Sequence, residues 1–187
     1  MKYVTNFFRT LFVVSTGLYL LPHSVANAVT LSNGTIAFVE PPRLISASTP
    51  YSNTSVPNTT YYFTLEVPAT AGEALQQVTF NQIQGSEEIA FNQKDTFAFE
   101  GTRNHQGSKL ALKAVKGGDK QQSITVIFDT PIPPGKTVTI GLQTYYNPFT
   151  DGVYLFGVKA FPSGEKIAGQ SLGIGRFQFS GPTTTDN

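Results

Sequence analysis

The sequence contains no cysteine, no tryptophan and a single methionine, which is its first residue. Without cysteine the chain can form neither disulfides nor thiolate metal sites, so packing alone must hold the fold. Only two histidines occur, His23 and His105, and the second lies in a polar stretch typical of an exposed turn. Beyond residue 28, a metal site with two histidine ligands is therefore excluded within one chain. We expect no enzymatic activity and no cofactor.

Charged residues are also scarce, at 13% of the chain, and they nearly balance to a formal net charge of +1. Nucleic-acid binding requires clustered lysine and arginine, so a nucleic-acid partner is not expected. The aspartates at 95, 119, 129 and 151 do not follow the spacing of a calcium-binding loop. Calcium needs only oxygen ligands, however, so a carrier that binds an ion or a small ligand through oxygen atoms stays open as an alternative.

The N-terminal segment resembles a secretory signal peptide. Lys2 and Arg9 supply a basic start, residues 11–21 are a short apolar run, and Ala26-Asn27-Ala28 has the form of a cleavage site. The alternative is an uncleaved anchor, but a spanning helix needs roughly 20 apolar residues and this run is shorter. We therefore expect residues 1–28 to be removed and the product to be exported to the periplasm, cell envelope or cell exterior. No later segment is expected to span a membrane.

Downstream, apolar and polar residues alternate with a period of two. In residues 60–67, Tyr61, Phe63, Leu65 and Val67 fall on one face, which is typical of a half-buried strand. Other segments with this pattern, the last four weaker, are residues 123–129, 137–144, 153–161, 35–39, 77–83, 109–115 and 174–179.

Turn signals such as Asn33-Gly34 and Asp151-Gly152 separate these segments. We therefore predict an all-β protein, an immunoglobulin-like antiparallel β-sandwich of about eight strands over residues 29–180. A short helix is predicted over residues 69–77, and a flexible tail over residues 181–187.

Tyr154 follows Asp151-Gly152 in a pattern similar to the tyrosine corner of immunoglobulin domains. In that corner the tyrosine hydroxyl bonds to backbone a few residues upstream, and antibody domains place a cysteine two residues later, where Phe156 stands here. The alternative is an ordinary hairpin turn followed by a core tyrosine. Both interpretations fit an all-β domain.

The candidate binding residues are aromatic and charged rather than catalytic. Tyr145, Tyr146 and Phe149 lie beside a predicted loop and could stack on a sugar ring or on a partner's side chain. Alternatively, strand alternation buries one tyrosine and Phe149 closes the end of the sandwich. The segment Phe97-Ala98-Phe99-Glu100-Gly101-Thr102-Arg103 is the second candidate, and the simpler expectation is that its Glu100 and Arg103 pair with each other across a turn.

Several separated motifs follow one another along the chain, built mainly from proline, glycine and aromatic residues. They are Glu40-Pro41-Pro42-Arg43-Leu44, Tyr61-Tyr62-Phe63-Thr64-Leu65 with Pro68 and Ala71-Gly72-Glu73, Phe99-Glu100-Gly101-Thr102-Arg103, and Gly152-Val153-Tyr154-Leu155-Phe156-Gly157-Val158 with Ala160-Phe161-Pro162 and Gly164. This order resembles a secreted cyanobacterial group, domain-of-unknown-function family 2808, from about residue 33 to residue 179. The resemblance implies an exported cyanobacterial protein and transfers no activity and no catalytic residue.

Together, these observations predict an exported, non-catalytic β-sandwich that serves as a structural or binding module of the cell envelope or extracellular space. Its expected partner is an envelope polysaccharide or an exported protein. The alternative function is a periplasmic carrier of an ion or small ligand. The sequence does not predict an oligomeric state.

Overall fold

A computed structural model describes residues 29–30, 34–117 and 122–181. The expected signal peptide and residues 182–187 of the expected tail lie outside the described residues. Within them the chain forms the following strands: β1 (Val29–Thr30), β2 (Ile36–Ala37), β3 (Arg43–Ser48), β4 (Thr60–Glu66), β5 (Leu75–Gln84), β6 (Phe91–Thr102), β7 (His105–Leu110), β8 (Leu112–Gly117), β9 (Ser123–Ile132), β10 (Thr137–Thr144), β11 (Gly152–Pro162) and β12 (Gln170–Phe179).

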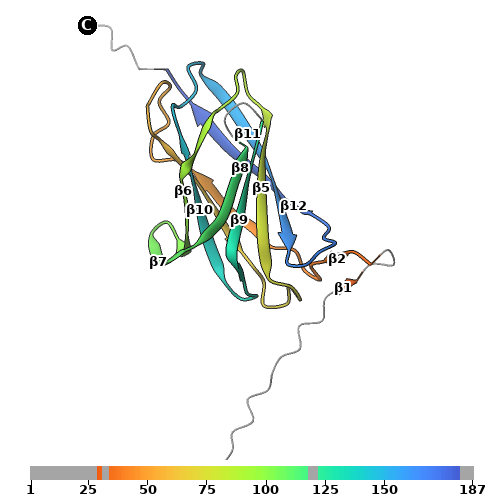
Figure 1. Ribbon diagram of the computed structural model, residues 1–187. Helices are drawn as coiled ribbons and strands as arrows, with labels where there is room; N and C mark the ends of the chain where they lie inside the picture. Colours follow the sequence, from red (N-terminus) through yellow and green to blue (C-terminus); the bar gives the residue numbers. More distant parts are fainter. Residues whose placement is uncertain (1–28, 31–33, 118–121, 182–187) are drawn as a thin grey trace, which may run out of the picture.

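The strands form a sandwich of two five-stranded antiparallel sheets, which confirms the predicted fold class (Figure 1). One sheet has the order β3-β4-β10-β6-β7 and the other has the order β12-β11-β5-β9-β8. The short strands β1 and β2 pair with each other beside the sandwich. The two sheets contain more strands than the eight expected, chiefly because β3, β6 and β7 have no clear alternating pattern.

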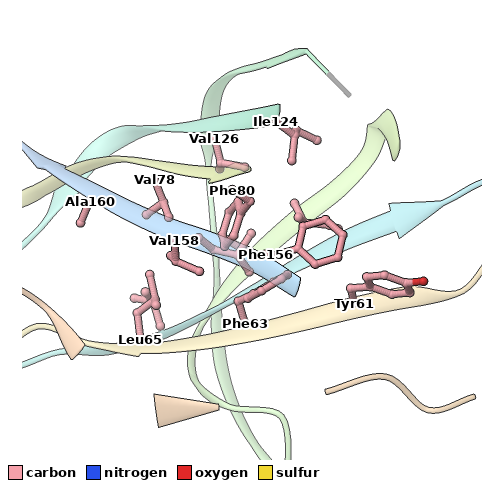
Figure 2. Packing of buried hydrophobic residues seen from close by; sticks show 14 of the residues in the cluster. Tyr61, Phe63, Leu65, Val78, Phe80, Ile124, Val126, Phe156, Val158 and Ala160 are labelled. Carbon is pink, nitrogen blue, oxygen red and sulfur yellow. The ribbon is translucent and has the colours of Figure 1, made fainter. Parts of the chain in front are cut away.

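The core lies between the two sheets and is rich in aromatic rings. Tyr61 and Phe63 of β4 face the other sheet and are fully buried, as the period of two predicts. Phe63 lies 4.5 Å from Phe80 of β5 and 6.2 Å from Phe156 of β11, measured between ring centroids. Figure 2 shows these rings converging from strands of both sheets. Burying such rings supplies the packing that a chain without disulfides needs.

The helix predicted over residues 69–77 is wrong. Gly72 has a φ of +76°, and the amide of Ala71 donates to the carbonyl of Pro68 at 3.0 Å, so the segment turns instead. Leu75 then begins β5, and Leu75 and Val78 are buried in the core. Burial in the sheet thus overrides the helical propensity of the local sequence. No helix in the part of the chain that the structure describes is long and apolar enough to cross a membrane.

The tyrosine corner is present. The hydroxyl of Tyr154, near the start of β11, donates to the carbonyl of Thr150 at 3.0 Å. The amide of Thr150 in turn donates to Glu87 Oε1 at 2.7 Å. These bonds hold the turn before β11 against residues that precede β6, and they fix one side of the loop described next.

Candidate binding surfaces

The segment after β10, residues 145–149, is here called the aromatic loop. Tyr145, Tyr146 and Phe149 are 44%, 52% and 66% exposed. The rings of Tyr146 and Phe149 lie 5.8 Å apart with an angle of 32° between their planes. The alternative in which one tyrosine is buried and Phe149 closes the end of the sandwich is therefore wrong, because Asn147 and Pro148 are the buried residues of this loop.

Asn147 holds the aromatic loop in place. Its side chain is fully buried, and its Nδ2 donates to the carbonyls of Tyr51 at 3.0 Å and Asn53 at 2.8 Å. The hydroxyl of Tyr61 donates to Asn147 Oδ1 at 3.2 Å. Burial raises the pKa of Tyr61, so this hydroxyl stays protonated and remains a donor. Every polar group of the Asn147 side chain is thereby paired, as a buried amide requires.

Backbone bonds fix the aromatic loop on both of its flanks. On one flank, the amide of Ser55 donates to the carbonyl of Pro148 at 2.9 Å, and the amide of Asn58 donates to that of Tyr145 at 3.0 Å. On the other flank, the amide of Tyr145 donates to the carbonyl of Ala90 at 3.2 Å. A pocket of about 110 Å³ lies between residues 87–90 and the loop. The exposed rings therefore stand on a backbone that is bonded from two directions.

Glu100 and Arg103 do not pair with each other, so the expectation of an ion pair between them is wrong. Glu100 Oε1 instead accepts a bond from Lys136 Nζ at 2.6 Å, and both side chains are exposed. The guanidinium of Arg103 lies over the ring of Tyr62, 4.9 Å from its centroid, which is a cation–π contact. The two residues therefore serve different contacts on the sheet that contains β6.

A further surface includes Phe97, Ala98 and Phe99 of the second candidate segment, together with residues that the sequence did not single out. A groove of about 460 Å³ runs along β6 and β7, and we call it the β6–β7 groove. Phe97, Phe99, Lys94 and Lys109 are among its lining residues. The sequence signal is the run Phe97-Ala98-Phe99, in which strand alternation places both phenylalanines on one face but does not reveal that this is the outer face of the sheet.

The carrier alternative, in which an ion or small ligand is bound through oxygen atoms, stays a prediction. Within residues 29–30, 34–117 and 122–181, no three His, Cys, Asp or Glu side chains lie close enough together to hold a metal ion. His105, the histidine of the described residues, is exposed at the start of β7. The aromatic loop and the β6–β7 groove are two surfaces with aromatic lining.

Comparison with known proteins gives a family and only weak structural likenesses. The family model "Protein of unknown function (DUF2808)" matches residues 35–179. No curated protein sequence matches the chain.

Three solved structures illustrate the structural likeness. A DUF4466 family protein from Parabacteroides merdae is 13% identical, with a TM-score of 0.44, and the match covers 73% of this chain but only 44% of that chain. A collagen-binding domain of a Staphylococcus aureus adhesin is 9% identical, with a TM-score of 0.38 and coverage of 72% and 95%. The RrgA Jo.In complex is 14% identical, with a TM-score of 0.43 and coverage of 81% and 90%. These values carry no inference about what this chain binds.

Proposed function

The chain belongs to the DUF2808 family of proteins of unknown function, and we propose that it is a non-catalytic binding module whose aromatic loop is its binding surface. The observation that carries this proposal is the exposure of Tyr145, Tyr146 and Phe149 on a backbone held by buried Asn147. Large apolar side chains gathered at one exposed site are favoured for recognition. Because the loop is already ordered, binding would lose little backbone entropy.

The partner proposed for the aromatic loop is an envelope polysaccharide or an exported protein. Aromatic rings offer flat apolar faces that stack on sugar rings or on apolar side chains, and the tyrosine hydroxyls add hydrogen bonds. Ser55, Asn58 and Thr150 lie beside the loop, and Glu87 and Glu88 line the pocket next to it. These two carboxylates would repel a strongly acidic partner, so the loop fits a neutral polysaccharide or a protein surface that is not acidic.

Export to the periplasm, the cell envelope or the cell exterior is part of the same proposal. Its support is the basic start, the short apolar run and the Ala26-Asn27-Ala28 motif. Fractionation of the host cells followed by mass spectrometry of the N-terminus tests it. We expect the protein outside the cytoplasm with Val29 as its first residue. A cytoplasmic protein that retains residues 1–28 would contradict this part of the proposal.

Replacing Tyr146 and Phe149 together by alanine is expected to reduce binding by at least about tenfold, because exposed aromatic anchors carry much of the energy of such surfaces. The measurement is a binding screen against envelope polysaccharides and the exported proteome. The melting temperature should hardly change, since both side chains are more than half exposed.

A matched control is the replacement of Ile174 by alanine, because this side chain on β12 is 56% exposed and lies away from the aromatic loop. It removes exposed apolar surface elsewhere and should leave binding unchanged. Equal losses of binding in both variants would mean that nonspecific binding to exposed apolar surface, rather than the aromatic loop, explains the result. Full binding by the double variant would remove the aromatic loop from the proposal.

A further inference from the structure

The β6–β7 groove lies apart from the aromatic loop. Residues 94–99 of β6 line the groove, together with Gln106, Gly107 and Lys109 of β7. Residues 87–90 and 145–149 line the pocket beside the aromatic loop, so the two share no lining residue. The groove is therefore a separate surface, which the proposed function does not use.

The floor of the groove is aromatic and backed by a glycine. Gly141 of β10 lies opposite Phe97, and a Cβ on this glycine would stand 2.5 Å from Cζ and 2.8 Å from both Cε atoms of the ring. The ring of Phe97 therefore lies across the glycine, so that the β10 backbone supports one of its faces. The ring of Phe99 is nearly parallel to it, at an angle of 19° and a centroid distance of 6.2 Å, but Phe99 is only 5% exposed, so the half-buried ring of Phe97 presents the aromatic surface of the floor.

The rim of the groove is basic. Lys94 and Lys109 both line it, and neither makes an ion pair with any residue that the structure describes. Asp95 is the acidic lining residue, and its Oδ2 accepts a bond from Asn92 Nδ2 at 2.6 Å. Two lysines thus flank the ring of Phe97. Gln106 lies beside them, and its Nε2 donates to the carbonyl of Arg103 at 3.2 Å.

From this arrangement we propose that the β6–β7 groove binds an anionic polysaccharide, with the carbon-bonded hydrogens of a sugar ring against Phe97 and carboxylates or sulfates at Lys94 and Lys109. The charge complementarity argues for an acidic ligand. The ring face of Phe97 argues for a sugar ring rather than for a peptide, because a peptide strand is recognised by pockets for alternate side chains. The aromatic loop has no lysine among its contacts and is not part of this site.

Calorimetric titration with an oligosaccharide of uronic acids tests the site, with a neutral glucan oligosaccharide of equal length as the matched ligand. Replacing Lys94 or Lys109 by glutamine is expected to weaken uronate binding by about five- to tenfold. Replacing Lys159, an exposed lysine of β11 in the other sheet, by glutamine is the control and should change nothing. Raising the salt from about 0.05 M to about 0.5 M should also weaken binding, because the charges are exposed to solvent.

The floor is tested by replacing Phe97 with leucine, which still covers Gly141 but removes the aromatic face. We expect uronate binding to weaken by about tenfold while the melting temperature, measured alongside, confirms that the variant is folded. The double change of Tyr146 and Phe149 to alanine should leave uronate binding intact, so this site can fail or succeed independently of the aromatic loop.

Four results would overturn the proposal. They are no uronate binding at all, equal binding of the neutral glucan, unchanged binding in both lysine variants, and binding of a poly-glutamate peptide in place of the uronate.

Discussion

Replacing Asn147 by leucine is expected to lower the free energy of unfolding by about 2–4 kcal/mol. Leucine has a similar size, so the change removes polar atoms without opening a large cavity. It leaves the hydroxyl of Tyr61 without its acceptor and the carbonyls of Tyr51 and Asn53 without their donor. Each buried group that loses its partner costs about 1–3 kcal/mol, and the two carbonyls recover part of that cost by turning to water.

The matched control for this change is the replacement of Tyr61 by phenylalanine, which removes only the bond to Asn147 Oδ1 and should cost about 1 kcal/mol. Urea unfolding measures both variants. Hydrogen exchange of residues 145–149 should become faster in the Asn147 variant, because the backbone beneath the exposed rings loses its support. Equal stabilities of the two variants, with unchanged exchange, would show that Asn147 does not hold the aromatic loop.

Replacing Phe156 by alanine is expected to lower the free energy of unfolding by about 3–5 kcal/mol, the usual cost of removing a buried aromatic ring. Phe156 is buried at the centre of β11, at the position where antibody domains carry a disulfide cysteine. Its ring packs against four others, with centroid distances of 6.1 Å to Tyr61, 6.2 Å to Phe63, 5.8 Å to Phe91 and 5.8 Å to Phe177.

The control for Phe156 is the exposed Ile174, whose replacement by alanine should change stability by less than about 0.5 kcal/mol. Thermal and urea unfolding of the two variants measure the difference. A loss below about 1.5 kcal/mol at Phe156 would mean that the core relaxes around the missing ring. In that case the aromatic cluster would not be the main source of stability in this chain without disulfides.

The strands that the sequence predicts well are those with one face in the core and one face in solvent. Over residues 60–67 the alternation of Tyr61, Phe63 and Leu65 with polar neighbours corresponds to the buried face of β4. The alternation over residues 153–161 likewise marks β11. In both strands burial follows the period of two, so local pattern and final environment agree.

The strands that the sequence does not predict lack a regular alternation of apolar and polar residues. In β6, Asn92 Oδ1 accepts from the amide of Lys94, and Thr96 Oγ1 donates to the carbonyl of Asn92, which interrupts the alternation with local polar bonds. Phe97 and Phe99 then occupy the outer face although they are apolar. The edge strand β7 is nearly all exposed, so it has no apolar pattern to detect.

The candidate site was predicted only in part. The composition of residues 145–149 indicates an aromatic surface, and its rings are exposed in the structure. Asn147, however, stands before a proline, and its local sequence indicates only a turn residue. The role of Asn147 depends on Tyr61 and Tyr51, which are 86 and 96 residues away along the chain. Nothing in the local sequence reports such distant partners.

The pairing of distant strands has a consequence for the time at which the protein folds. β4 pairs with β10, and the side-chain hydroxyls of Thr64 and Thr139 meet although they are 75 residues apart in the sequence. β5 likewise pairs with β9 and β11, which both follow it in the sequence. Neither layer can assemble until most of the polypeptide has left the ribosome, and such non-local topologies fold slowly. The nascent chain therefore stays unfolded for longer, a state that the proposed export through a membrane channel would require.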